Sequence, residues 1–132
     1  MKKEIKRLVE ASPYKGTMIY VAQPFGGDER QQERAQQTIT RLIEQYPDMV
    51  FVSPVLQYGH MYESCPYVDG MDLCLDLLAK CGALLLMPGW EESRGCMAEW
   101  AAASAWGIRT YYGDGDCIIH RIEKGDRLWE KH

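Results

Sequence analysis

The sequence alternates short apolar runs with longer segments of helical periodicity, and this alternation restricts the fold more than any other feature. The runs at 18–22, 49–52 and 83–87 are almost wholly apolar, and each is followed by a stretch with apolar residues at helical spacing. Strands without a polar face are typical of a parallel sheet covered by helices on both sides. We therefore expect an α/β fold, a three-layer sandwich with a mainly parallel sheet of four or five strands, Rossmann-like or flavodoxin-like.

Three helices are expected between the strands. Asp28 is a candidate N-cap for the first, Gln31 completes a capping-box pattern, and Pro47 ends that helix. Its apolar residues stand at helical spacing: Ala35, Ile39, Leu42, Ile43 and Tyr46. A second helix is expected from Asp69, its candidate N-cap, to about Lys80, and a third follows residue 93. The segment 53–68 is expected to be a long loop.

The remaining segments complete a single expected domain over residues 1–132. Residues 1–16 carry mixed charges and are expected to form a short amphipathic helix or arm. A fourth strand is expected at 108–112. The tail, 113–132, is polar except for an apolar patch at 117–119, which is a candidate edge strand.

Composition and charge narrow the possible partners. The chain is 46% hydrophobic and 26% charged, with a net charge of −4, which argues against a nucleic-acid-binding surface. No apolar run approaches the roughly 20 residues of a membrane span, and the N-terminus lacks the apolar core of a secretory signal. Five cysteines at irregular spacing, without a CxxC pair, predict no zinc or other metal site and indicate a reducing, cytoplasmic location. Cys81 and Cys96 flank expected core elements and are predicted to be buried.

The segment Ser93–Glu99 is the strongest candidate for chemistry. It follows the strand at 83–87 and a Pro-Gly-Trp turn, and it opens a stretch of helix formers. Ser93 is a natural N-cap, Gly95 allows a ligand to approach the backbone, and the free N–H groups of a helix start attract anions. Glu99 lies one turn inside the helix. A carboxylate beside an anion site, at the carboxyl end of a strand, indicates chemistry on a phosphorylated ligand. The alternative is an ordinary cap and a solvated glutamate.

Several of these residues together resemble a known enzyme superfamily. The strand end Ile19-Tyr20, the loop ending Gly26-Gly27 and the pattern Ser93-x-Gly95-x-x-x-Glu99 are similar to the nucleoside 2-deoxyribosyltransferase superfamily, which includes deoxynucleoside 5′-monophosphate N-glycosidases. The resemblance spans 17–112. A Pro-Gly-Trp-x-x-Ser-Arg-Gly stretch points to an uncharacterised bacterial and phage branch.

The resemblance implies a role for each matching residue. Glu99 would attack C1′ of the sugar as a nucleophile, and Tyr20 would orient it by a hydrogen bond. The expected substrate-binding residues are Gln23, Phe25, Gly26, Gly27, Trp90, Ser93, Arg94 and Gly95. The substrate would be a small nucleoside or nucleotide, no metal or organic cofactor is implied, and relatives of this kind are homo-oligomers.

The pattern departs from the superfamily at two positions. Members of the superfamily have an aspartate that assists proton transfer to the base, and Cys74 stands at that position here. Another acid is therefore needed. Asp69 and Asp72 are the nearest candidates in the sequence, and we favour Asp72. A thiol with an ordinary pKa near 8.5 is a poor general acid at neutral pH. The second departure is Phe25, which stands where monophosphate-specific relatives have an arginine.

Alternative interpretations remain for single residues and for the function. Trp90 either caps the core or stacks on a base, and we favour stacking. The alternative for Tyr20 is an aromatic side chain of the core, and the alternative for Arg94 is a solvated surface charge. The leading function is cleavage or exchange of an N-glycosidic bond. Its alternative is a non-catalytic nucleotide-binding or sensing module, which the replacement of aspartate by Cys74 favours. A flavodoxin-like FMN carrier fits the architecture but lacks a Ser/Thr-rich phosphate loop.

Overall fold

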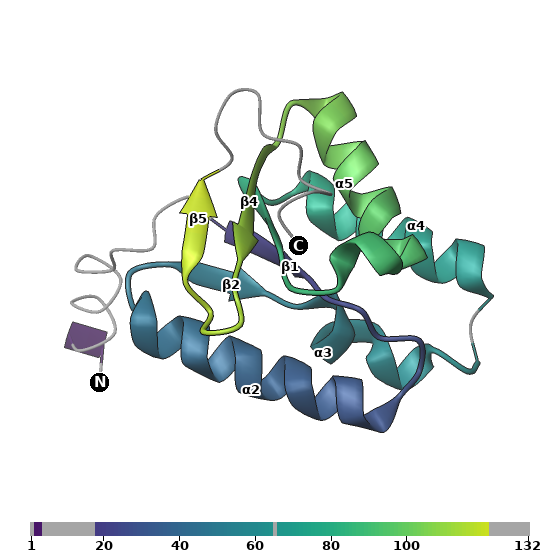
Figure 1. Ribbon diagram of the computed structural model, residues 1–132, viewed down its shortest axis with the longest axis horizontal. Helices are drawn as coiled ribbons and strands as arrows, with labels where there is room; N and C mark the ends of the chain where they lie inside the picture. Colours follow the sequence, from purple (N-terminus) through teal and green to yellow (C-terminus); the bar gives the residue numbers. More distant parts are fainter. Residues whose placement is uncertain (1, 4–17, 65, 122–132) are drawn as a thin grey trace.

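One five-stranded sheet forms the centre of the molecule in the computed structural model, which describes residues 2–3, 18–64 and 66–121 (Figure 1). The strand order is β2-β1-β3-β4-β5. The strands are β1 (Met18–Ala22), β2 (Val50–Val52), β3 (Ala83–Leu86), β4 (Arg109–Gly113) and β5 (Ile119–Arg121). The first four are parallel, and β5 runs antiparallel to β4. The helix or arm expected over residues 1–16 lies outside the described residues, apart from Lys2 and Lys3.

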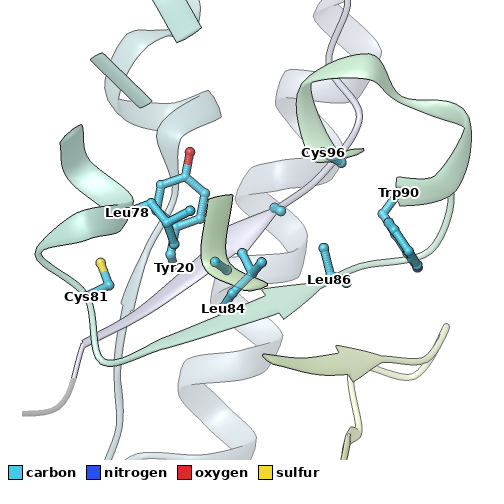
Figure 2. Packing of buried hydrophobic residues seen from close by; sticks show 9 residues of the cluster. Tyr20, Leu78, Cys81, Leu84, Leu86, Trp90 and Cys96 are labelled. Atoms are coloured by element: carbon cyan, nitrogen blue, oxygen red, sulfur yellow. The ribbon is translucent and has the colours of Figure 1, made fainter. Parts of the chain in front are cut away.

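Helices cover both faces of the sheet, which confirms the three-layer α/β fold. Helix α2 (Glu29–Gln45) packs Leu42 against the face that carries Val21 and Leu85. Helices α4 (Tyr67–Ala79) and α5 (Arg94–Trp106) cover the opposite face. That second core includes Tyr20, Leu78, Cys81, Leu84, Leu86, Trp90, Cys96 and Ala103 (Figure 2). Among the described residues, no helix is both long enough and apolar enough to cross a membrane.

The central strands are apolar on both faces because both faces are covered. Tyr20 and Val21 are neighbours on β1, so they point to opposite faces, and both are fully buried. Their partners in β3, Leu84 and Leu85, are likewise inaccessible. The continuous apolar runs therefore reflect central parallel strands, as the sequence predicts.

Helix α2 begins as expected but differs from the prediction in detail. The Asp28 side chain caps it by accepting a hydrogen bond from the Arg30 N–H (2.9 Å). The Asp28 N–H donates to the Phe25 carbonyl rather than to a side chain, so the reciprocal half of the expected capping box is absent at this position. Ile43, which the helical pattern placed on the apolar face, is 51% exposed, whereas Thr38 is buried.

The prediction of a long loop at 53–68 is wrong, because most of this segment is helical. Ser53 caps a short helix, α3 (Pro54–Tyr58), by accepting a hydrogen bond from the Leu56 N–H (3.3 Å). A 3₁₀ turn, η1 (Gly59–Met61), follows. A serine cap followed by proline at the first helical position is a strong helix start, which the analysis of the sequence overlooked.

Helix α4 starts two residues earlier than predicted. It begins at Tyr67 with Pro66 as its N-cap, so Asp69 lies in the first turn instead of capping it. The tail does contribute an edge strand, β5 (Ile119–Arg121), but it begins at the last residue of the apolar patch at 117–119, and residues 117 and 118 precede it. Its turn is held by Asp114, whose carboxylate accepts hydrogen bonds from the N–H groups of Asp116 (2.9 Å) and Ile118 (3.0 Å).

Two neighbouring residues of α2 test this packing. Leu42→Ala removes a fully buried side chain, so the free energy of unfolding should fall by about 2–5 kcal/mol. Ile43→Ala alters an exposed side chain and should change it by about 0.5 kcal/mol or less. Urea unfolding followed by circular dichroism measures both values. Equal losses in the two variants would mean that α2 is rotated relative to the sheet.

Candidate functional site

A cavity opens where β1 and β3 end. Its volume is about 780 Å³, which is within the range of small-molecule sites. The walls come from the loop after β1, from α3 and η1, from the first turns of α4, and from the 3₁₀ turn η2 (Trp90–Glu92) with the start of α5. This is the edge of a parallel sheet at which ligands are expected.

Glu99 and Tyr20 form a buried pair at the cavity. Glu99 is on α5 and only 5% exposed, yet it lines the cavity; Tyr20 is on β1 and is fully buried. The Tyr20 hydroxyl donates a hydrogen bond to Glu99 Oε2, which joins two residues 79 positions apart in the sequence. A carboxyl group this far from water needs such a donor, because burying an unpaired charge is costly. The pairing that the sequence analysis expected is therefore present.

Burial sets the protonation of this pair. It raises the pKa of Glu99 to about 7, and the hydrogen bond from Tyr20 opposes part of that rise. Burial, and then the neighbouring Glu99, raise the pKa of Tyr20 far above its usual range. The same two causes raise the pKa of the half-buried Cys74 thiol to about 11. At neutral pH Tyr20 and Cys74 are thus protonated, while Glu99 exchanges its proton near neutrality.

Ser93 caps α5 as predicted. Its hydroxyl accepts a hydrogen bond from the Cys96 N–H (3.3 Å), and its carbonyl accepts one from the Met97 N–H (2.9 Å). Gly95 packs closely against α4, because a Cβ there would lie 3.5 Å from Met71 Sδ. Ser93, Arg94 and Gly95 all line the cavity. An anion site at this helix start stays a prediction.

The loop after β1 supplies most of its expected contacts. Gln23, Phe25 and Gly26 line the cavity. The Gln23 side-chain amide donates to Thr38 Oγ1 (3.0 Å), which fixes its direction. Gly27 is not part of the cavity wall. Its φ of 79° suits glycine, and a Cβ there would lie 2.7 Å from the Tyr62 ring, so a glycine at this position allows that packing.

Trp90 belongs to the core, which corrects the interpretation of this residue as a base-stacking side chain. Its indole is 0% exposed and packs against Trp100 with ring centroids 5.6 Å apart. The turn through Gly89, whose φ of 89° is left-handed, and the following 3₁₀ turn direct the indole inward (Figure 2). A fully buried ring is unavailable to a ligand.

The two candidate acids lie outside the cavity. Asp69 and Asp72 are both exposed and do not contribute to its wall, whereas Cys74 does. Two residues along an α-helix correspond to a rotation of about 200°, so Asp72 faces away from the side that Cys74 presents to Glu99. Asp72 would reach the cavity only if the first turn of α4 were distorted, and the structure has a continuous α-helix from Tyr67 to Ala79 with Asp72 exposed.

The cavity also contains residues that the sequence analysis missed. Glu92 is an exposed carboxylate at its edge, and Arg34 of α2 brings a guanidinium to the wall. Tyr58 and Tyr62 line the wall as well, and Tyr62 packs edge-on against Phe25 with centroids 5.2 Å apart. Their spacing of four residues was the available signal for helical turns in this segment. Within the described part of the chain, no group of three or more His, Cys, Asp or Glu side chains could hold a metal ion.

Comparison with known proteins identifies the family and supports the fold. The sequence profile of the family described as a domain of unknown function, DUF4406, matches residues 17–112. No curated protein matches the chain. Among solved structures, the chain is similar to a 2-desoxiribosyltransferase from Leishmania mexicana, with 19% identity and a TM-score of 0.55. The match covers 74% of this chain and 64% of that chain, so it spans less than two thirds of the longer protein.

The buried position of Glu99 predicts a pH-dependent stability. Its pKa is raised in the folded chain, so the protonated form favours folding: this stability is fully present below about pH 4.5 and is lost as the pH rises through about 7. Glu99→Gln cannot ionise. Its free energy of unfolding should therefore exceed that of the native chain by up to about 3 kcal/mol at pH 8, and by little at pH 4.5. Chemical denaturation at both pH values measures the difference in the free energy of unfolding between Glu99→Gln and the native chain. If this difference is the same at pH 8 and at pH 4.5, the burial argument is contradicted.

Proposed function

The chain belongs to the DUF4406 family, and we propose that it is an enzyme that breaks or transfers the N-glycosidic bond of a nucleoside or nucleotide. The observation that carries this proposal is the Glu99 carboxyl group, which lies in the wall of a nucleotide-sized cavity and accepts a hydrogen bond from Tyr20. A carboxyl group is buried at such a place at a cost in stability, and groups of this kind cluster at sites of chemistry.

In this proposal Glu99 is the nucleophile. Its carboxylate attacks C1′ of the sugar, the bond from C1′ to the base breaks, and a glycosyl-enzyme ester forms through a transition state with positive charge on the sugar. Water or a second base then attacks C1′ and releases Glu99. Tyr20 holds the attacking carboxyl group in one orientation, and its hydrogen bond favours the ionised form that can attack.

The sugar-phosphate end of the substrate would bind at the start of α5. Ser93, Arg94 and Gly95 line that part of the cavity, where the dipole of α5 favours an anion. A guanidinium is well suited to phosphate, so Arg94 would add to this contact. This arrangement supports a nucleoside 5′-monophosphate as substrate.

The similarity to a 2-desoxiribosyltransferase supports the class of reaction but not its details. Transfer to a second base and hydrolysis by water both begin with the same attack by Glu99, so they share the residues described above. We include both a deoxyribosyltransferase and a 5′-monophosphate N-glycosidase in the proposal, together with a cytoplasmic location.

A second candidate function is a non-catalytic nucleotide-binding or sensing module. The observation that favours it is the exposure of Asp69 and Asp72, since neither reaches the cavity to protonate a leaving base. Such a module would bind nucleotides in the same cavity and release no base. Titration calorimetry combined with analysis of the ligand after incubation distinguishes the two.

A homo-oligomer is also part of the proposal. Large apolar side chains are exposed on the helices of one layer: Leu73 on α4, and Met97 and Trp106 on α5, are 37%, 37% and 50% exposed. Exposed apolar side chains on neighbouring helices are suited to association between copies of the chain.

The first functional test is base release from a panel of nucleosides and 5′-monophosphates, followed by chromatography. Glu99→Gln should lower the rate by about 1,000-fold or more, because it removes the nucleophile while keeping its shape. Glu44→Gln is the matched control, since Glu44 is an exposed residue of α2, and it should retain full activity. Equal turnover by Glu99→Gln would refute the role of Glu99, and binding without base release by the native chain would favour the binding module.

The pH profile tests the role of Tyr20. Because Glu99 must be ionised to attack, kcat/KM should rise as the pH increases through about 7. Tyr20→Phe removes the hydrogen bond that lowers the pKa of Glu99, so the rise should move to higher pH and the plateau should be lower. If Tyr20 is only a core aromatic, the midpoint of the profile will not move.

A further inference from the structure

The cavity has two chemically different halves. The polar half is formed by Glu92, Ser93, Arg94 and Gly95 at the start of α5. The apolar half is formed by Phe25, Val55, Tyr58, Met61 and Tyr62, which come from the loop after β1, α3 and the turn η1, and Gln31 and Arg34 of α2 also line the cavity. Cys74 and Glu99 line the same cavity. A nucleotide with its phosphate in the polar half would place its base in the apolar half.

Among the described side chains, no carboxyl group lies in the apolar half. The two carboxyl groups of the cavity are Glu99, which is the proposed nucleophile, and Glu92, which directly precedes Ser93 on the polar side. Asp69 and Asp72 are exposed outside the cavity. A base bound against the aromatic side chains would therefore have no carboxylic acid beside it.

The thiol of Cys74 does not replace the missing acid. Burial and the charge of Glu99 raise its pKa to about 11, so it gives up a proton less readily than an ordinary thiol. Cys96, in the same wall, is similar, with a pKa raised to about 12 mainly by burial. Both sulfurs are neutral groups at physiological pH and supply a compact, weakly polar surface.

The missing acid matters for some leaving bases and not for others. A purine or pyrimidine base bound through an uncharged ring nitrogen leaves as an anion unless it is protonated, and general acid catalysis of that step contributes about 100- to 10,000-fold. A base whose ring nitrogen already carries a positive charge takes the bonding electron pair and leaves as a neutral molecule. Release of such a cationic base therefore needs the nucleophile but no general acid.

Two further features of the cavity suit a cationic ring, whereas the guanidinium of Arg34 in the wall would oppose one. The Glu99 carboxylate would face the positive charge, and a nearby cation favours its ionised form. Phe25, Tyr58 and Tyr62 bring three aromatic rings to the cavity lining, and cations bind well to the faces of aromatic rings. An aromatic cation gains from stacking and from this electrostatic attraction at once.

We infer that the substrate of this site is a nucleotide whose base is a positively charged pyridine ring, joined to the sugar through its ring nitrogen. This inference rests on the proposed N-glycosidic function and narrows its substrate class. It follows from a cavity that joins a buried nucleophilic carboxyl group to an aromatic half in which the described residues place no carboxylic acid.

The proposed reaction balances without an additional reactant other than water. Glu99 Oε forms a bond to C1′ as the bond from C1′ to the ring nitrogen breaks. The electron pair of that bond goes to the nitrogen and cancels its charge, so the pyridine leaves as a neutral molecule. Water then attacks C1′, Glu99 is released as a carboxylate, and the proton from water passes to solvent.

Matched substrates test this inference directly. Nicotinamide mononucleotide carries a cationic pyridine ring, and its reduced 1,4-dihydro form has the same size and the same sugar phosphate but a neutral ring. The native chain should release nicotinamide from the oxidised form with kcat/KM at least about 100-fold above the values for the reduced form, AMP and dAMP. Glu99→Gln should abolish that release, and Glu44→Gln should not.

A variant at Cys74 provides a second test. Cys74→Asp places a carboxyl group in the apolar half, so it should raise base release from AMP or dAMP by about 10-fold or more and should not raise release from nicotinamide mononucleotide. If this variant does not fold, the substrate comparison with the native chain still decides the question.

The outcomes of these tests distinguish failure of the cationic-base inference from failure of the proposed N-glycosidic function. Release of purines by the native chain at rates equal to or above that of nicotinamide would overturn the inference and leave the N-glycosidic function intact. Equal release from the oxidised and reduced forms would also overturn it. If no substrate loses its base, the proposed function itself fails, and the inference fails with it.

Discussion

The burial of one carboxyl group is the constraint on which the rest of this site depends. Glu99 is only 5% exposed and lies where α5 packs against the sheet. A charge in such a place is costly unless a donor faces it, and the Tyr20 hydroxyl is that donor. The pair can form only if β1 and α5 are held in fixed positions, so the packing of the second core determines the chemistry of the cavity.

The parallel sheet brings these distant residues together. Neighbouring parallel strands end at the same edge, so the loop after β1 and the helix start after β3 face each other although about 65 residues separate them. Tyr20 pairs with Leu84 across the sheet, which places its ring on the face that α5 covers. The cavity is thus a consequence of strand order, and its polar groups come from the points where the chain leaves the sheet.

Periodicity predicted the strands and the start of α5 because local patterns determine them. The apolar runs fix the central strands, and Ser93 caps α5 as its side chain predicts. Periodicity could not predict the short helices of the segment 53–68, because they have no full period; their signal was instead the serine cap followed by proline at Ser53 and Pro54. The direction of Trp90 was equally unpredictable, since it depends on Trp100 in another element.

The thiol at position 74 changes what the carboxyl group of Glu99 can do. An aspartate at this place would put two carboxyl groups in one buried site, and the repulsion between them would raise the pKa of one of them strongly. The neutral Cys74 removes that repulsion, so burial and Tyr20 alone set the ionisation of Glu99. In the proposed reaction, the protein thereby keeps a carboxylate available near neutral pH and has no thiol or carboxyl group at position 74 that would protonate the base. That combination is useless for a leaving group that must be protonated and sufficient for one that already carries a positive charge.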